Sequence, residues 1–160
     1  MDTTLNPWAD AFVADMLDRS AHRWPDNVAL VDGDVRLTYA ELVSRRDRLA
    51  GVLADRDIGE GTVVALYLGE GWEHVVLIYA LLYLGARLVP LNLTWEEREL
   101  RYALEHASVE VLVAATTYRG NRLWGRLSGV PIAHDVQLPN LPDLRWVIGF
   151  DPDEVESGPS

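Results

Sequence analysis

The first residues with the types and spacing to do chemistry lie between Gly69 and His74. The run Gly69-Glu70-Gly71-Trp72-Glu73-His74 stands between two apolar stretches, which is the setting of a dinucleotide-binding fingerprint. However, His74 stands where that fingerprint needs its third glycine. Glu70 and Glu73 would also repel a pyrophosphate at a helix N-terminus, and no carboxylate for a ribose follows about 20 residues later. We therefore interpret the run as a tight turn between a strand and a helix.

A second candidate is Ala115-Thr116-Thr117-Tyr118-Arg119-Gly120, which faintly resembles a phosphate-binding loop rich in serine and threonine. It has one glycine and no lysine. Its amides therefore cannot form the nest of N–H groups that cradles a phosphate, and we assign no phosphate site to it.

Other reactive side chains are scattered along the sequence. The four histidines lack the spacing of a metal motif, no serine lies in a G-x-S-x-G elbow, and the absence of cysteine excludes disulfides and thiolate sites. The acids between Asp151 and Glu156 lie in a stretch without an apolar pattern, which we interpret as a solvated tail. The sequence thus predicts no catalytic, cofactor-binding or metal-binding residue. The histidines are His22, His74, His106 and His134.

The composition limits the classes of function. The chain has 160 residues, the size of one ordinary domain, and its 49% hydrophobic content is enough for a core. A net charge of −11 argues against nucleic acid or an anionic membrane as partner. Residues 1–7 lack the pattern of a signal peptide, and no apolar run reaches the roughly 20 residues of a membrane span. We expect a cytoplasmic protein.

The turn at Gly69–His74 belongs to the clearest structural pattern in the chain. Val63–Leu68 is apolar at every position, as in a parallel strand covered on both faces. Trp72–Leu84 is apolar almost all round, which indicates a buried helix, and Gly85 can end it in a left-handed conformation. Leu88–Asn92 follows as a second short strand. Together these segments predict a βαβ unit in an α/β domain.

Upstream of that unit, the pattern predicts a helix, a hairpin and a second helix. The first helix begins at Asn6 and Pro7 and stops near Trp24. Strands at 28–31 and 35–37 flank the turn at Asp32-Gly33-Asp34. Thr38 and Glu41 form a capping box for the second helix. That helix is expected to turn Tyr39, Leu42, Leu49 and Leu53 inward, and Arg45, Arg46, Arg48 and Asp55 toward water.

Downstream, Thr94 and Glu97 suggest a second capping box. It would start a helix that buries Leu100, Ala103, Leu104 and Ala107. We expect strands at 109–114, 130–133 and 145–150 and a short helix at 121–127. Most of the six tryptophans should pack in the structure, with Trp95 exposed. We expect residues 1–150 to form one incomplete subdomain and residues 151–160 to be a disordered acidic tail.

Four of these stretches resemble, in order and spacing, motifs of the adenylate-forming (AMP-dependent) ligases, which include acyl-CoA synthetases, luciferases and nonribosomal adenylation domains. Arg23–Leu30 resembles the opening of that family, and Leu37–Leu42 its LTYxEL motif. Leu84–Asn92 resembles a stretch of the form aGAvyvPlnp, and Glu99–Leu104 the helix that follows it. The resemblance covers residues 16–114, and more loosely extends to Phe150. It implies the N-terminal subdomain of the ligase fold: a mostly parallel sheet flanked by helices, with an N-terminal helix and hairpin.

The resemblance also implies a parent reaction. Acyl-CoA synthetases of this family convert a carboxylic acid, ATP and CoA into acyl-CoA through an acyl-adenylate, with Mg²⁺. They use a Ser/Thr/Gly-rich loop that ends in lysine, and a second lysine in a C-terminal domain. This chain contains no lysine, its 14 basic residues all being arginine, and Ser160 stands about where that loop would be approaching. We therefore expect that this chain alone is inactive and binds no cofactor.

Two other functions remain open. The chain could be a truncated binding module that docks onto a separate remainder or onto another ligase, or that self-associates through an exposed apolar face. An unrelated flavodoxin-like cofactor domain is also compatible with the fold class.

Overall fold

The computed structural model describes residues 12–118, 121–122 and 138–150. The chain divides into two compact units. We call residues 1–60 and 71–86 the helical unit, and residues 61–70 and 87–160 the sheet unit. The strand Val63–Tyr67 and the helix Trp72–Tyr83 of the expected βαβ pattern therefore fall in different units.

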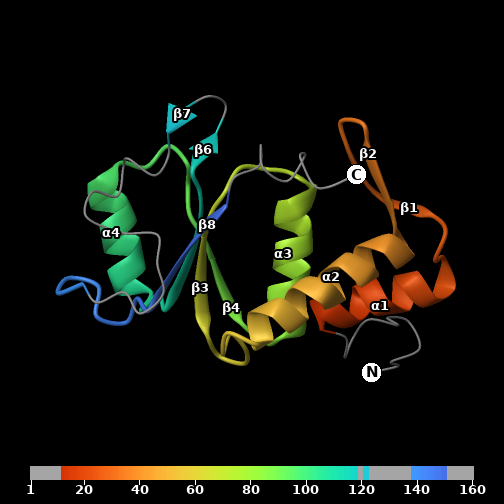
Figure 1. Ribbon diagram of the computed structural model, residues 1–160, viewed down its shortest axis with the longest axis horizontal. Coiled ribbons are helices and arrows are strands. Elements are labelled where there is room, and N and C mark those ends of the chain that lie inside the picture. The colour runs from red at the N-terminus through yellow and green to blue at the C-terminus, as the bar shows by residue number, and fades with distance from the viewer. Residues whose placement is uncertain (1–11, 119–120, 123–137, 151–160) are drawn as a thin grey trace, which may run out of the picture. The chain divides into compact units, whose positions relative to one another are not determined.

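In its described residues, the helical unit contains three helices and a hairpin (Figure 1). The elements are α1 (Val13–Arg23), β1 (Val28–Asp32), β2 (Val35–Thr38), α2 (Tyr39–Ala54) and α3 (Trp72–Tyr83). Leu17 from α1, Leu37 from β2, Leu42 from α2 and Val76 from α3 are buried together. Four of the five elements contribute one of these side chains, and the partly buried Leu30 of β1 packs against them, so burial of apolar surface joins all five.

The hairpin forms as the sequence predicts. β1 and β2 pair antiparallel, with Leu30 opposite Leu37 and Asp32 opposite Val35. Gly33 has a φ of 54°, the left-handed conformation that glycine adopts without steric cost. The register shifts between Val28 and Leu30, so the hairpin contains an irregularity near its start.

The predicted capping box at the start of α2 is confirmed. The Thr38 hydroxyl accepts a hydrogen bond from the Glu41 backbone N–H at 3.2 Å, and the Glu41 carboxylate accepts one from the Thr38 N–H at 2.8 Å. Two backbone donors that a helix start would leave unpaired are thus satisfied. The N–H and the hydroxyl of Thr38 both donate to Glu41, which lowers the pKa of that carboxyl below its ordinary 4.5.

Arg46 is the main correction to the sequence prediction. We expected it to face water, but it is 2% exposed. Its guanidinium lies 2.7 Å from both Asp18 of α1 and Asp47 of α2, and it stacks 4.4 Å from the ring centroid of Tyr83 of α3. Burial lowers the pKa of Arg46, but the hydrogen bonds to Asp47 and Asp18, together with the negative charges of these two residues, outweigh burial and raise it overall. The aliphatic stem of arginine can cross an apolar surface while its fork binds carboxylates.

The end of α3 follows the prediction at Gly85. This glycine has a φ of 76°; its N–H donates to the Leu82 carbonyl, and the N–H of Ala86 donates to the Leu81 carbonyl. These two bonds form a Schellman motif, which satisfies carbonyls at the helix end.

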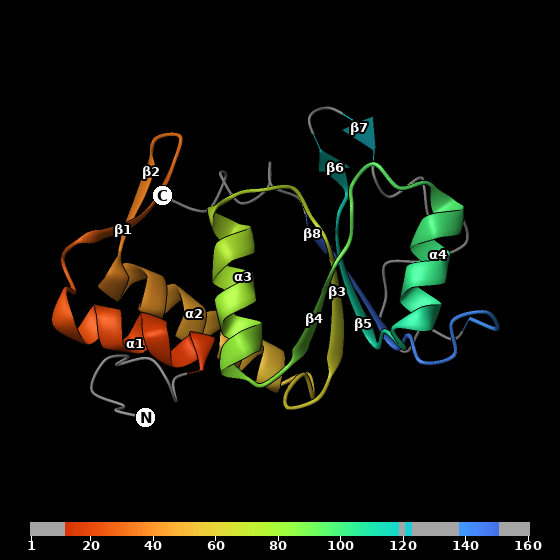
Figure 2. The same cartoon turned by 180° about the vertical axis from the view of Figure 1, so that it is seen from behind.

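The sheet unit is built on four parallel strands in the order β4-β3-β5-β8 (Figure 2). They are β3 (Val63–Tyr67), β4 (Arg87–Pro90), β5 (Val111–Ala115) and β8 (Trp146–Phe150). Every residue of β3 and β5 is buried, as their unbroken apolar sequence predicts. The expected α/β fold with a mostly parallel sheet is therefore confirmed.

Helix α4 (Glu97–His106) buries Leu100 and Leu104 as expected, but it starts differently. Its N-cap is Glu96, whose N–H donates to the Glu99 carboxylate at 2.8 Å. The predicted box at Thr94 and Glu97 is wrong. Thr94 instead donates from its N–H and its hydroxyl to Asn92 Oδ1, both at 2.9 Å. The side chain of Asn92 captures the threonine in a local turn, which asparagine favours.

The predicted helix at 121–127 is wrong at its start, since β6 (Thr117–Tyr118) and β7 (Asn121–Arg122) form an antiparallel hairpin. The other residues of that prediction lie outside the described part of the chain. So do the predicted strand at 130–133, the predicted helix start at Asn6 and the predicted disordered tail at 151–160. Among the described helices, none has the length and apolar character to cross a lipid bilayer.

We expect Arg46→Ala to lower the free energy of unfolding by about 2–3 kcal/mol, because it removes the cation that joins three helices and leaves a cavity. Arg48→Ala is the matched control on the same helix, since Arg48 is exposed, and it should cost less than about 0.5 kcal/mol. Urea denaturation measures both changes. Equal effects of the two substitutions would contradict the role of Arg46.

The lowered pKa of Glu41 predicts a pH dependence of stability. A carboxyl whose pKa is lowered by folding stabilises the protein at pH values above the pKa that it has in the unfolded chain. This contribution is lost as the pH falls through the pKa that it has in the folded protein. In Glu41→Gln, the decrease in stability on acidification below pH 4.5 should be shallower than in the unaltered protein. Thermal denaturation as a function of pH measures this, and parallel curves for the two proteins would refute it.

Candidate functional site

The start of α3 is the first candidate from the sequence, and its first backbone N–H already binds a carboxylate. The backbone N–H of Trp72 donates to Asp32 Oδ2 at 2.9 Å. A Cβ added at Gly71 would lie 2.9 Å from Glu73 Oε2 and 3.6 Å from Asp32 Oδ2. Two carboxylates therefore converge at the N-terminus of α3, where a phosphate would have to bind. This arrangement supports the interpretation of the segment as a structural turn.

A cation, the Arg45 guanidinium, lies beside this turn but stacks on Trp72. The Arg45 guanidinium stacks 4.6 Å from the centroid of the Trp72 ring. Such a stack of arginine on tryptophan contributes stability through the negative face of the ring. Asp32, Trp72 and Arg45 thus link the hairpin, α3 and α2.

The carboxyl ends of the parallel strands are the second place to look, because open α/β sheets bind their ligands there. After β4, Asn92 is engaged with Thr94 in the local turn described above. The Tyr67 hydroxyl at the end of β3 donates to the Leu93 carbonyl at 3.5 Å. Thr116 leads from β5 into the β6–β7 hairpin. These contacts fix loops of the chain itself. Of the stretch 115–120 that we considered as a phosphate loop, Ala115 ends β5 and Thr117 and Tyr118 form β6, while residues 119–120 lie outside the described part of the chain.

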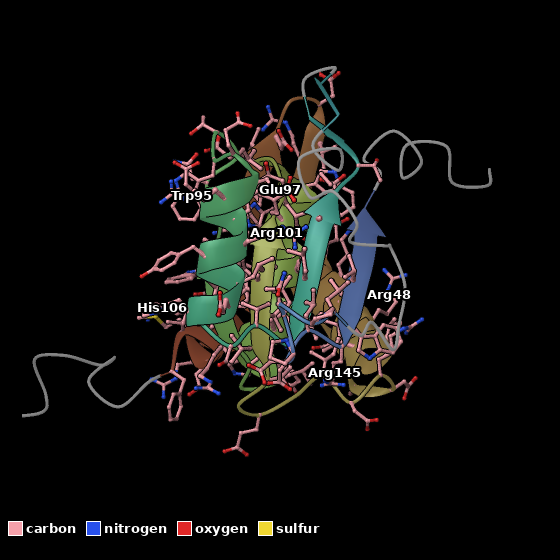
Figure 3. All side chains as sticks on the ribbon, turned by 90° about the vertical axis from the view of Figure 1, so that its left-hand side faces the viewer. Arg48, Trp95, Glu97, Arg101, His106 and Arg145 are labelled. Carbon is pink, nitrogen blue, oxygen red and sulfur yellow. The ribbon has the colours of Figure 1, made fainter. Side chains whose placement is uncertain are left out.

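The amino ends of the same strands are held by Glu110. Its Oε1 accepts a hydrogen bond from the Val63 N–H at 3.1 Å, and its Oε2 lies 3.4 Å from Arg145 Nε. Its backbone carbonyl also accepts from the N–H groups of Arg145 and Trp146. Figure 3 shows Arg145 at the end of the sheet where β8 begins. Glu110 therefore sets the relative register of β3, β5 and β8.

The outer surface of α4 carries aromatic and charged side chains. Figure 3 shows Trp95 and His106 near the two ends of this helix, with Glu97 and Arg101 between them. Glu97 and Arg101 form an ion pair at 2.8 Å, one helical turn apart. The rings of Tyr102 and His106 stack with centroids 5.4 Å apart. Both pairs are spaced four residues apart and stabilise the helix locally.

The three described histidines lie on three different helices. His22 and His106 are exposed in the last turns of α1 and α4, where a positive charge is favourable, and His74 is half-buried in α3. His134 lies outside the described residues. In the part of the chain that the structure describes, no three His, Cys, Asp or Glu side chains are grouped to hold a metal ion.

The tryptophans differ from expectation in two places. Trp24 is 44% exposed, with the Arg23 guanidinium 4.8 Å from its ring centroid, and Trp95, which we expected to be exposed, is half-buried. Trp72 and Trp146 are half-buried and pack as expected. Trp8 and Trp124 lie outside the described residues.

No local sequence pattern predicts the bond of Asp32 to α3, the contacts of Glu110 with the sheet or the burial of Arg46. Asp32 and Trp72 are 40 residues apart, and Glu110 and Val63 are 47 apart. Periodicity reports on neighbours within one helix or strand, so it cannot detect partners at these separations.

Comparisons with known proteins agree with the fold. The family model described as AMP-binding enzyme matches residues 17–157. A medium/long-chain-fatty-acid–CoA/3-oxocholest-4-en-26-oate–CoA ligase of Mycobacterium marinum is 35% identical over 136 residues, which are 85% of this chain and 22% of that protein. A 2-hydroxy-7-methoxy-5-methyl-1-naphthoate–CoA ligase of Streptomyces carzinostaticus is 34% identical, covering 96% of this chain and 27% of that protein.

The structure is also similar to that of a Mycobacterium tuberculosis fatty acyl CoA synthetase. The TM-score is 0.75 at 25% identity, and the match covers 91% of this chain and 27% of the synthetase. The chain thus spans about a quarter of the length of the relatives it matches. Because the family model covers most of the sequence and a similar structure accompanies it, this protein belongs to the AMP-binding enzyme family.

Proposed function

We propose that this chain is the N-terminal part of an acyl-CoA ligase, which activates an apolar carboxylic acid with ATP and Mg²⁺ and transfers the acyl group to CoA. The match of residues 17–157 to the family carries this proposal. The two relatives described above act, by their names, on fatty and steroid acids in one case and on a naphthoic acid in the other. Their common chemistry is an apolar acid and CoA.

The residues that the structure describes do not fit the triphosphate of ATP. A phosphate cradle needs convergent free amides and a cation. The chain contains no lysine, and the N-terminus of α3 is occupied by the carboxylates of Asp32 and Glu73. We therefore assign the chain a scaffold role, and we assign ATP, Mg²⁺ and CoA to the remainder of the ligase. The cytoplasm, which supplies ATP and CoA, is the compartment that this function requires.

The exposed apolar side chains favour a second form of the same function, in which this chain docks onto a separately produced remainder. Eight large apolar residues are exposed on the described surface: Phe12, Val13, Trp24, Val28, Val31, Val52, Tyr83 and Tyr102. Exposed apolar residues that gather on one surface mark interaction sites. Most of these eight belong to the helical unit.

Isothermal titration of the purified chain with ATP and Mg²⁺ tests the scaffold role. Because the chain has no lysine and two carboxylates lie at the N-terminus of α3, we expect no binding heat up to millimolar nucleotide. A dissociation constant in the micromolar range would refute the assignment of ATP to the remainder.

A chimera tests the ligase proposal itself. In the chimera, this chain would replace the matching N-terminal region of the Mycobacterium marinum ligase, and the rest of that ligase would be kept. We expect the chimera to fold, which circular dichroism reports, and to form acyl-CoA from a fatty acid. A control that lacks the N-terminal region altogether should form none. A folded chimera without activity would argue against the proposal.

A further inference from the structure

The turn of the β1–β2 hairpin contains the single Asp-Gly pair of the 160-residue sequence, Asp32-Gly33. Since Asp32 pairs with Val35, Gly33 and Asp34 form a two-residue loop between the strands. All three residues from Asp32 to Asp34 are exposed. An aspartate followed by glycine can react with its own backbone, because glycine presents its nitrogen without a side chain beside it. The turn thus places a carboxyl carbon and a nucleophilic nitrogen in adjacent, solvent-accessible residues.

The backbone nitrogen of Gly33 is open to such a reaction. A Cβ added at this glycine would meet no atom within 4 Å, apart from those of the adjacent residues, so the space beside the backbone is empty. Among the described residues, the Gly33 N–H makes no backbone hydrogen bond that would hold it in place. Its φ of 54° lies in a region that glycine enters and leaves without steric cost. The nitrogen can therefore turn toward the Asp32 side chain.

The carboxylate of Asp32 is restrained by α3. The Trp72 N–H donates to Asp32 Oδ2 at 2.9 Å, which holds the carboxylate toward the helix. While this bond is intact, the carboxylate does not rotate toward Gly33. A single hydrogen bond at the protein surface opens and closes repeatedly, because local opening there costs much less than global unfolding. The bond to Trp72 thus slows the reaction but does not prevent it.

We propose that Asp32 is a site of spontaneous isomerisation to isoaspartate, independently of the proposed ligase function. The Gly33 nitrogen attacks Cγ of the protonated Asp32 carboxyl, a C–N bond forms, and one water leaves with the proton of that nitrogen. The product is a five-membered succinimide ring. Water then adds to one of the two ring carbonyls, the C–N bond of that carbonyl breaks, and the nitrogen takes a proton. Opening at one carbonyl restores aspartate, and opening at the other gives isoaspartate with an unchanged mass.

Isomerisation would disconnect the hairpin from α3. In isoaspartate, Cγ belongs to the amide that leads to Gly33, so the carboxylate that accepts from the Trp72 N–H no longer exists. A charged acceptor forms a stronger bond than a neutral one, and a negative charge favours a helix N-terminus. The main chain also gains one carbon atom in the turn, which displaces Asp32 from its pairing with Val35. The start of α3 therefore loses its cap.

The test is to age the full 160-residue chain at physiological temperature and neutral pH, and to map its peptides with a fragmentation method that distinguishes isoaspartate from aspartate. Asp34 is the matched internal control, because it is exposed in the same turn but precedes the β-branched Val35. We expect about tenfold more isoaspartate at Asp32 than at Asp34. Equal amounts at the two positions would contradict the role of Gly33. No isoaspartate at Asp32 in the folded chain would overturn the proposal, and the same chain aged in urea verifies that the assay detects it.

Hydrogen exchange at the Trp72 N–H, followed by NMR, tests the consequence for α3. In the isomerised fraction of the aged chain this exchange should be faster than in the fresh chain, because the bond to the Asp32 carboxylate is lost. Asp32→Glu is the control, since glutamate keeps the charge but would have to close a six-membered ring, which forms far more slowly. Aged Asp32→Glu should therefore exchange at Trp72 as it does when fresh. Isomerisation without faster exchange at Trp72 would overturn the effect on α3, as would an equal increase in the aged variant.

Discussion

Parallel pairing of β3 with both β4 and β5 is the interaction on which the sheet unit depends. Parallel neighbours cannot be joined by a two-residue turn, so the chain must travel through a long connection before each strand returns. These connections contain α3 and α4. The register is then fixed by Glu110, which binds the backbone of Val63 and pairs with Arg145. This pattern of strand pairing thus goes together with apolar strands, with helices in the connections and with the ion pair of Glu110 and Arg145 at the amino ends of the strands.

Features of the fold that depend on neighbouring residues could be predicted from the sequence. The unbroken apolar run of β3, the Thr38–Glu41 cap and the left-handed Gly85 each lie within a few residues. Predictions failed where a distant partner or a competing local bond decides. The position of Arg46 in the helical pattern predicts a surface residue. It is buried because it pairs with carboxylates of two helices and stacks on a tyrosine ring. Thr94 has the spacing of a helix cap, but it donates its hydrogen bonds to the side chain of Asn92 instead.

At the candidate site, too, local sequence patterns did not reveal a distant partner. A glycine-rich turn between a strand and a helix is the setting in which phosphates bind. The sequence argued against a phosphate here through the acids within the turn, through His74 in place of a third glycine and through the missing ribose carboxylate. Asp32, from a hairpin 40 residues earlier, completes the cap at Trp72. Together with the absence of lysine from the chain, this arrangement supports our proposal that the region is a scaffold. In that proposal, the chemistry of ATP and CoA belongs to the remaining polypeptide.

The most direct test of this division is to measure the formation of AMP and acyl-CoA by the purified 160-residue chain alone. The assay would supply ATP, Mg²⁺, CoA and, in turn, a medium-chain fatty acid, a long-chain fatty acid and an aromatic acid. We expect no product above the protein-free control with any of the acids. Product that forms in proportion to the amount of protein, with any one of them, would contradict the scaffold role at the centre of this account.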